Sequence, residues 1–377
     1  MLQSPLLDPH HYPANSVTVL IGANGSGKSR HLREICLRSL RRGENVVAVS
    51  PSPYDRFGGI RNSSFQFFGS RLGPRAIRRM MSSLILRAST GDPKVLSNFT
   101  RALEHTGFDA AIGIRVPELP TDKLQRMLQE KEPLAVELAR ALERWGDRSS
   151  SNGIVALRIQ SYSFTELHAL NIGFIVRHEA RLPSLGIKGK IEYFFIRGGE
   201  PIPLLEACSG EIAYVTTFAF IAAQITPRAI IAIDEPETSL HPTWQKGYVS
   251  MLLDLFSLFE PRIFISTHSP IIISGAQTTE HAVTVLEAAP SSIRLFQHQR
   301  LSLEEMYDRL FHIITPKNHH LSNRAVSLLN DLSAGNRSLA NVQESLKRLR
   351  ERSYDGRQRE AISKIEELAR RVSSARK

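Results

Sequence analysis

The sequence predicts an α/β fold in which helices flank a mainly parallel β-sheet. Short β-branched runs at residues 17–21, 229–233 and 262–266 are typical of strands that are buried on both faces of a parallel sheet. Each run ends in polar residues, and the first leads through a glycine-rich loop into a helical pattern at 28–40. Ligands bind at the carboxyl ends of strands in open α/β sheets, so the three strand ends predict one shared site.

Composition and charge narrow the class of protein. The chain has 377 residues, 42% hydrophobic and 23% charged, which is ordinary for a globular protein with room for more than one domain. No apolar stretch reaches membrane-spanning length and no export signal is recognisable, so we expect a cytoplasmic protein with no membrane contact. With two cysteines a disulfide framework is excluded. The net charge of +11 favours nucleic acid or an acidic partner, unless the basic side chains are only solvated helix faces.

The glycine-rich loop at residues 22–29, GANGSGKS, is a full match to the phosphate-binding P-loop pattern. Glycines let successive backbone N–H groups converge on one anion, and the helix that follows adds its positive end. Lys28 is expected to reach the β- and γ-phosphates, and the Ser29 hydroxyl to bind Mg²⁺. The residues predicted to hold the nucleotide here are Gly22, Asn24, Gly25, Ser26, Gly27, Lys28, Ser29 and Arg30.

Two adjacent carboxylates, Asp234 and Glu235, stand at the end of the strand predicted at 229–233. They suggest divided work, in which one carboxylate reaches Mg²⁺ and the other polarises a water for attack on a phosphoryl group. An isolated Ile-Asp-Glu would more simply be a solvated acidic turn, but the P-loop and two further motifs argue against that interpretation. One of them is His268, which follows the strand at 262–266 and can hydrogen-bond a γ-phosphate or the attacking water.

The other motif is Ser209-Gly210-Glu211, which opens an apolar helix. A hydroxyl and free backbone N–H groups at a positive helix end suit a terminal phosphate, although the same pattern is more often a plain helix cap. Its place 25 residues before Asp234 favours the phosphate-binding interpretation.

The remaining patterns predict a strand at 46–49, a loop at 52–59, and helices from 75 to 145 that are interrupted at Pro133. Strands are predicted at 154–159 and 172–176, a hairpin from 191–196 and 201–205, and closing strands at 283–286 and 293–296. Beyond Pro316 the chain is again helical. We therefore divide it into a P-loop lobe at 1–60, a helical insertion at 61–150, a second lobe at 151–315 and a helical tail at 316–377.

Taken in order, the P-loop, Ser-Gly-Glu, Asp-Glu-Pro-Glu with Ser-Leu-His-Pro, and Ser-Thr-His-Ser-Pro resemble the motifs of ABC-type ATPase heads. The spelling is most similar to the RecF/SMC-related and OLD-like ATPases. The resemblance covers roughly 15–60 and 190–290, and the insertion is too short for a long coiled-coil arm. The signature departs from that of the better-known transporters, which carry other residues at the position of Cys208, and Gln66 is only a weak candidate for the glutamine that usually links the nucleotide to the insertion.

The resemblance implies a role for each matching residue. Lys28 and Ser29 would hold the phosphates and Mg²⁺, Asp234 would complete the metal shell, Glu235 would be the catalytic base, and His268 would contact the γ-phosphate. Ser209 and Gly210 would face the nucleotide of the opposite subunit, with Ser239 in the loop that couples the two sites.

The resemblance further implies a slow, regulatory ATPase that binds ATP and Mg²⁺ at the head-to-tail interface of a homodimer or higher oligomer. In its motif sequences and its lack of an appended nuclease, the chain is similar to the ATPases of Septu and retron anti-phage systems, which control a separate nuclease or toxin. Two alternatives remain: a RecF-like clamp on DNA, and a scaffold that binds ATP without turnover, against which Glu235 argues.

Overall fold

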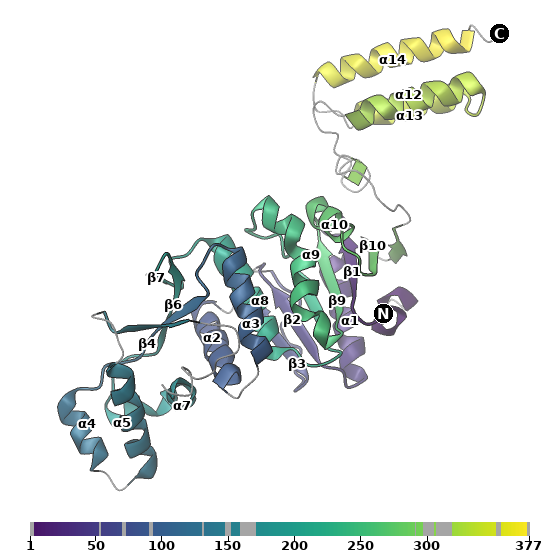
Figure 1. Cartoon of the computed structure of the whole chain (residues 1–377). Helices are drawn as coiled ribbons and strands as arrows, with labels where there is room; N and C mark the ends of the chain where they lie inside the picture. The colour runs from purple at the N-terminus through teal and green to yellow at the C-terminus, as the bar shows by residue number, and fades with distance from the viewer. Residues whose placement is uncertain are drawn as a thin grey trace.

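The computed structural model describes residues 4–52, 54–69, 73–89, 93–129, 132–147, 152–158, 171–290, 292–296, 305–306, 319–351 and 356–374. A central sheet of seven strands has the order β11-β10-β1-β9-β8-β2-β3 (Figure 1). All neighbours pair in parallel except β10 and β11, which are antiparallel. The strands are β1 (Ser16–Ile21), β2 (Val46–Ser50), β3 (Phe65–Gly69), β8 (Ile230–Asp234), β9 (Arg262–Thr267), β10 (Val283–Ala289) and β11 (Ser292–Leu295).

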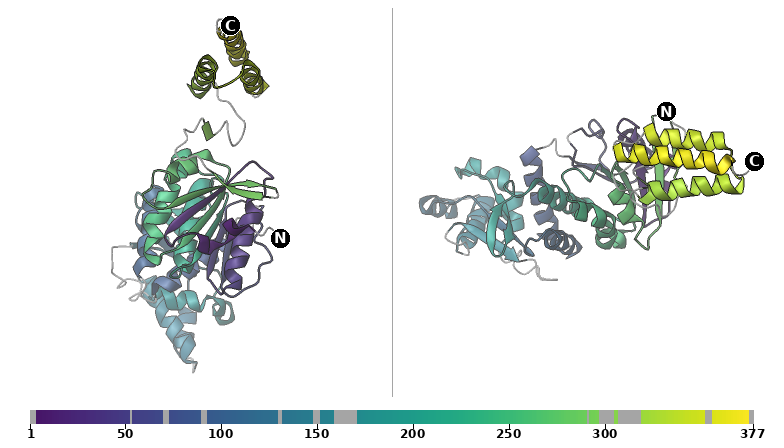
Figure 2. Two further views of the ribbon diagram at one scale, coloured as in Figure 1. Left: turned by 90° about the vertical axis from the view of Figure 1, so that its right-hand side faces the viewer. Right: turned by 90° about the horizontal axis from the view of Figure 1, so that it is seen from above.

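Helices cover both faces of this sheet, because its central strands are apolar on both sides (Figure 2). Leu20 of β1 faces a core formed with α1, whereas its neighbour Val19 faces the larger core on the other side. The larger core is formed with α2, α3, α8, α9 and α10. The helices are α1 (Lys28–Arg41), α2 (Gly73–Ser89), α3 (Pro93–His105), α8 (Ser209–Gln224), α9 (Pro242–Phe256) and α10 (Pro270–Ala276).

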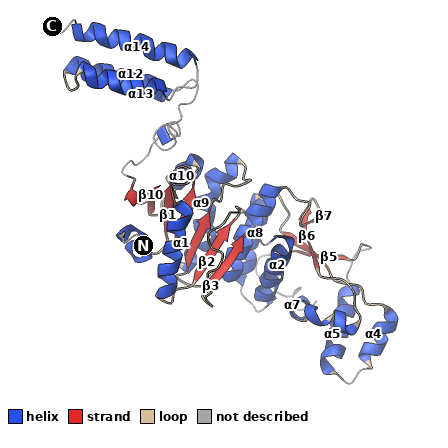
Figure 3. Cartoon of the chain, turned by 180° about the vertical axis from the view of Figure 1, so that it is seen from behind, coloured by secondary structure: helices blue, strands red, loops and turns tan. Residues whose placement is uncertain are grey.

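A second, wholly antiparallel sheet has the order β5-β4-β6-β7. Its strands are β4 (Ala111–Arg115), β5 (Ile154–Arg158), β6 (Glu192–Arg197) and β7 (Glu200–Pro203). The predicted hairpin is confirmed: Gly198 and Gly199 both have positive φ, and their N–H groups donate to the Asp109 carboxylate. The helices α4 (Thr121–Leu128) and α5 (Pro133–Gly146) follow β4 in the chain and lie side by side (Figure 3). Pro133 opens α5, so the helical stretch is interrupted there as predicted.

Three sequence expectations differ from the structure. Residues 172–176 were expected to be a strand, but they lie in helix α7 (Ile172–Arg177). Ile172, Ile175 and Val176 are buried there at helical spacing, and the helix packs against α2 and α5, so tertiary contacts override the β-branched composition. Strands β3 and β4 were not predicted, and both lie within the 61–150 segment that was expected to be helical.

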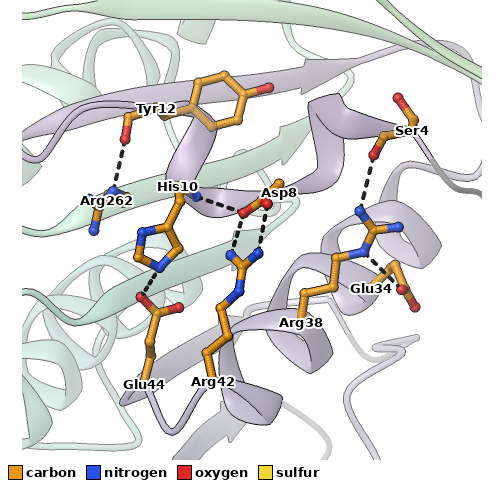
Figure 4. A network of polar contacts seen from close by, with 9 residues as sticks. All are labelled: Ser4, Asp8, His10, Tyr12, Glu34, Arg38, Arg42, Glu44 and Arg262. Carbon is orange, nitrogen blue, oxygen red and sulfur yellow. Dashed lines mark hydrogen bonds and ion pairs between the residues drawn. The ribbon is translucent and has the colours of Figure 1, made fainter.

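The N-terminal segment is tied to the far end of α1 (Figure 4). It contains the short 3₁₀ helices η1 (Pro5–Leu7) and η2 (Pro9–His11). Both carboxylate oxygens of Asp8 accept from Arg42, while Arg38 donates to the Ser4 carbonyl at 3.0 Å. Tyr12 is buried, and its hydroxyl donates to the Leu6 carbonyl at 2.8 Å. These contacts hold the N-terminal segment against the C-terminal end of α1, which is the end opposite to the P-loop.

The helical character expected beyond Pro316 is confirmed for the described residues. Helices α12 (His319–Ala334), α13 (Leu339–Glu351) and α14 (Gly356–Ser374) pack together around an apolar core of their own, which includes Leu332, Leu346 and Ile362. Within the described residues there are also the 3₁₀ helices η4 (Glu179–Arg181), η5 (Pro183–Leu185) and η6 (Ser257–Phe259).

Candidate nucleotide site

The P-loop curls between β1 and α1 as its sequence predicts. Gly25 and Gly27 have φ of 81° and 89°, a left-handed conformation that favours glycine, and Gly27 caps the first turn of α1. Lys28 is buried, and its Nζ donates to the carbonyls of Gly22 at 2.8 Å and Ala23 at 3.1 Å. Burial lowers the pKa of this amine, although three nearby carboxylates oppose the shift. The ammonium is thus held over the concave side of the loop.

Asp234 lies at the end of β8, beside the start of α1 and the end of β9. Ser29 Oγ donates to Asp234 Oδ1 at 2.9 Å, and Ser266 Oγ donates to the same oxygen. Burial, with a smaller contribution from the neighbouring carboxylates Glu235 and Glu237, raises the pKa of Asp234 to about 6 against these two hydrogen bonds. One hydroxyl and one carboxylate suit Mg²⁺, which prefers hard oxygen ligands and fills its remaining positions with waters and substrate phosphates.

Glu235 follows Asp234 in a left-handed conformation with φ of 52°. This φ is uncommon for a residue other than glycine, and it is held by the Glu235 N–H, which donates to the Ser266 carbonyl at 2.9 Å. The conformation turns the chain out of the sheet while Glu235 stays at the strand end, partly exposed. Ser239, four residues later, has a similar φ of 67°.

These residues line one pocket of about 650 Å³. It brings together residues predicted from three separated segments, namely Asn24, Gly25, Gly27, Lys28, Ser29, Arg30, Asp234, Glu235 and His268. Five further lining residues were not predicted from the sequence: Arg33, Ser52, Tyr54, Arg56 and Pro290. Tyr54, which lines this pocket, is 86% exposed. The place of residues 52–59, directly after the parallel strand β2, was the available signal, because such loops meet the ligand at the same sheet edge.

His268 is held by Glu237, a residue to which the sequence analysis gave no role. Its backbone N–H donates to Glu237 Oε1 at 2.7 Å, and its Nδ1 lies 2.9 Å from the same oxygen. The hydrogen bond to Glu237 raises the pKa of His268 against partial burial. The imidazole remains 44% exposed and faces the pocket that it lines.

The Ser209-Gly210-Glu211 motif opens α8 but lies outside this pocket. Glu211 completes a capping box: Oε2 accepts from the Cys208 N–H at 3.0 Å, and Oε1 accepts from Arg197 at 2.6 Å. Ser209 is exposed and lines a second, smaller pocket of about 240 Å³ together with Ser239. A Cβ on Gly210 would lie 2.5 Å from the Ser239 carbonyl oxygen, so glycine allows this close approach.

Gln66 does not approach the nucleotide site. It is exposed on β3, and its Nε2 donates to the Ser63 carbonyl at 3.3 Å, at the start of the strand and away from its carboxyl end. Over the described ranges, no three His, Cys, Asp or Glu side chains gather in a way that could hold a metal ion. Nor does any helix in those ranges have the length and apolarity to cross a membrane.

Comparison with known proteins agrees with this arrangement. The sequence model of the family described as "AAA domain, putative AbiEii toxin, Type IV TA system" matches residues 17–274, which span β1, the P-loop, α8 and the ends of β8 and β9. The chain belongs to this AAA-domain family. No curated protein matches the chain. Among solved structures, VirB4 of Thermoanaerobacter pseudethanolicus is similar over 79% of this chain and 81% of its own, with 11% identity and a TM-score of 0.30.

Proposed function

We propose that the chain is an ATPase that binds ATP with Mg²⁺ and transfers the terminal phosphoryl group to water. The observation that supports this most is the convergence of Lys28, Ser29, Asp234, Glu235 and His268 on one pocket. Membership of an AAA-domain family supports nucleotide binding independently.

The residues divide the work by their chemistry. Lys28 would neutralise the β- and γ-phosphates, and Ser29 with Asp234 would hold Mg²⁺, which supplies positive charge to the phosphate oxygens. Glu235 would accept the proton of the attacking water, and His268 would donate to the γ-phosphate. Asp234 is suited to the metal because it is buried and fixed by two serines, whereas Glu235 is partly exposed.

We propose that two copies complete each other's sites. Ser209 and Gly210 lie at an exposed helix start outside the P-loop pocket of their own chain, which suits contact with nucleotide held by a neighbour. A two-fold axis would make both contacts equivalent, giving a homodimer that can be part of a larger oligomer. Ser239 touches Gly210 and so links the signature to the turn that carries Glu235.

We further propose that the ATPase controls a separate effector, a nuclease or toxin, in a bacterial anti-phage system in the cytoplasm. The family's description names a toxin–antitoxin context, which supports a partner of this kind. A second candidate is a RecF-like DNA clamp, favoured by the net charge of +11. Purification of the chain with its native neighbours would separate the two: a stoichiometric protein partner supports effector control, and salt-sensitive duplex binding that depends on ATP supports the clamp.

Calorimetry with ATP and Mg²⁺ tests the nucleotide site. Lys28→Ala removes the buried cation over the loop and should abolish measurable ATP binding. Arg41→Ala is a matched control, since it removes a positive charge from the other end of the same helix, where the side chain is 56% exposed. Equal ATP affinity in Lys28→Ala and the unmodified protein would overturn the assignment.

A further inference from the structure

Glu237 connects the carboxyl ends of β8 and β9, the two strand ends at which Asp234 and His268 lie. It lies in the turn after β8, is 7% exposed, and accepts both the backbone N–H and Nδ1 of His268, at the end of β9, through the single oxygen Oε1. A carboxylate that accepts both bonds fixes the main chain and the ring of the same residue. Rotation of the imidazole would break the Nδ1 contact and leave the buried carboxylate with the backbone N–H as its one remaining donor among the described residues, which is unfavourable.

The surroundings of Glu237 leave His268 as its bonded partner. Its second oxygen, Oε2, is buried with no hydrogen-bond partner in the part of the chain that the structure describes. The nearby Tyr248 has a pKa raised by burial, with the negative charge of Glu237 adding to the rise, so this phenol stays neutral. The other charges that act on His268 are Glu235, which favours the imidazolium, and Lys28, which opposes it.

We propose that Glu237 is a positioning residue for the ATPase reaction: it holds a proton on Nδ1 of His268 and thereby turns Nε2 towards the phosphate pocket. This inference rests on the proposed function and adds to it a residue that touches neither nucleotide nor metal. The second ring nitrogen of a histidine is commonly set in this way by a carboxylate behind it. With Nδ1 bonded to Glu237, Nε2 is the ring nitrogen left to donate to a phosphate oxygen in the pocket that His268 lines.

The arrangement also predicts which protonation states occur. The hydrogen bond and charge of Glu237 favour the imidazolium, so His268 remains a donor at both nitrogens to a higher pH than an ordinary histidine. When the ring does lose a proton, Glu237 should retain the one on Nδ1. Nε2 would then become an acceptor and would repel a phosphate oxygen, so the ATPase rate should fall on the alkaline side as His268 titrates.

Nitrogen-15 NMR of histidine-labelled, unmodified protein tests the contact, with the His268→Gln variant used only to assign the resonances. His268 should titrate above the usual pH for histidine and should be the Nδ1–H tautomer when neutral. A neutral Nε2–H tautomer, or a titration at or below the ordinary value, would overturn the proposal even if Glu237 variants failed to fold.

Glu237→Gln then tests the positioning role. The amide oxygen can still accept a hydrogen bond, but the charge is lost, so the alkaline limb of the kcat profile should move to lower pH. Because small misplacements of a reacting group can be costly, kcat should fall about 10- to 100-fold with KM changed much less. Glu44→Gln is a matched control, because Glu44 pairs with another histidine, His10, at 2.8 Å on the N-terminal segment.

The outcomes separate the two proposals. A wild-type protein that binds ATP but does not hydrolyse it contradicts the proposed function, whatever the state of His268. Wild-type hydrolysis together with an unchanged pH profile and unchanged His268 resonances in Glu237→Gln contradicts the role of Glu237 alone.

Discussion

The P-loop side and the signature side of the chain are built in different ways. On the P-loop side, residues from five segments line a pocket of about 650 Å³, and some of them are linked by side-chain hydrogen bonds such as that from Ser29 to Asp234. On the signature side, Ser209 stands exposed beside a pocket of about 240 Å³, and the motif is held by its capping box and by the close approach of Gly210 to Ser239. The P-loop side thus forms a pocket lined by charged and polar groups, whereas the signature side exposes Ser209 on the surface of the chain.

The two motifs thus occur in one chain without sharing a pocket. In the proposed dimer, changes on the P-loop side should alter nucleotide binding or the chemistry, while changes on the signature side should alter hydrolysis alone.

The largest effect is expected for Glu235→Gln. The variant keeps the size of the side chain but removes the base, and loss of general-base catalysis costs about 10²- to 10⁴-fold. ATP should still bind, because Lys28, Ser29 and Asp234 are untouched. Calorimetry should therefore show a nearly unchanged ATP affinity, while single-turnover measurements show much slower hydrolysis. A hydrolysis rate within about threefold of the unmodified protein would show that Glu235 is not the base.

Ser209→Arg should have the next largest effect. The serine is exposed, so the fold should tolerate the change, and ATP affinity should stay nearly intact since Ser209 lies outside the pocket of its own chain. Hydrolysis should fall about 10²- to 10³-fold, the usual size for a lost donor to transition-state charge. Ser184→Arg, at another exposed serine, is the control.

Mixing Ser209→Arg with Lys28→Ala chains sharpens this test. In a mixed dimer one site combines both defects, while the other has an intact P-loop facing an intact signature, so part of the activity should return. Absence of recovery in demonstrated heterodimers would indicate that both sites must be complete before either hydrolyses ATP. Full activity of Ser209→Arg by itself would contradict the head-to-tail arrangement.

Asp234→Asn should show that the buried, ionised Asp234 carboxylate lowers the stability of the folded chain at high pH. The folded-state pKa of Asp234 is raised from 3.8 to about 6, so its contribution to stability is fully present below pH 4 and is lost as the pH rises through 6. A shift of about two pKa units corresponds to at most about 3 kcal/mol. The variant should therefore unfold at a higher temperature than the unmodified protein at pH 8, with the gain gone at pH 4, while Mg²⁺-dependent ATP binding is lost. A lower unfolding temperature at pH 8 would contradict this account.

The same contrast explains how much could be predicted from the sequence. The P-loop and the strand ends at Asp234 and His268 were predictable, because each is a local pattern whose partners meet at one edge of a parallel sheet. Glu237 was not, because its role depends on a bond to His268, 31 residues away on another strand. The contact of Gly210 with Ser239 is likewise tertiary and leaves no pattern in either segment.

Strands β3 and β4 were missed for a related reason. The segment around them is dominated by helical spacing, while β3 is identified by its packing: Phe65 and Phe67 face Phe57 on one side, and Phe68 stacks on Phe220 of α8 on the other. The Ile-rich run in α7 was misassigned because its helical spacing and a β-strand composition compete, and only its contacts with α2 and α5 decide between them.

Gly210→Ala should have the smallest effect and distinguishes a positioned signature from a mere cap. A Cβ here would lie 2.5 Å from the Ser239 carbonyl oxygen, which is backbone and can move only with its loop. Alanine stabilises a helix interior by about 1 kcal/mol relative to glycine, but Gly210 lies in the first turn of α8, so the free energy of unfolding should fall as the Ser239 loop is displaced. Hydrolysis should also fall about tenfold, because moving the Ser239 loop displaces both the signature and the turn after Glu235. Gly146→Ala is the matched control, since it is also a helical glycine and its Cβ would meet no atom within 4 Å. If Gly210→Ala matched Gly146→Ala in both stability and hydrolysis, the contact would be incidental, and the signature would need only its exposed hydroxyl to act on a partner.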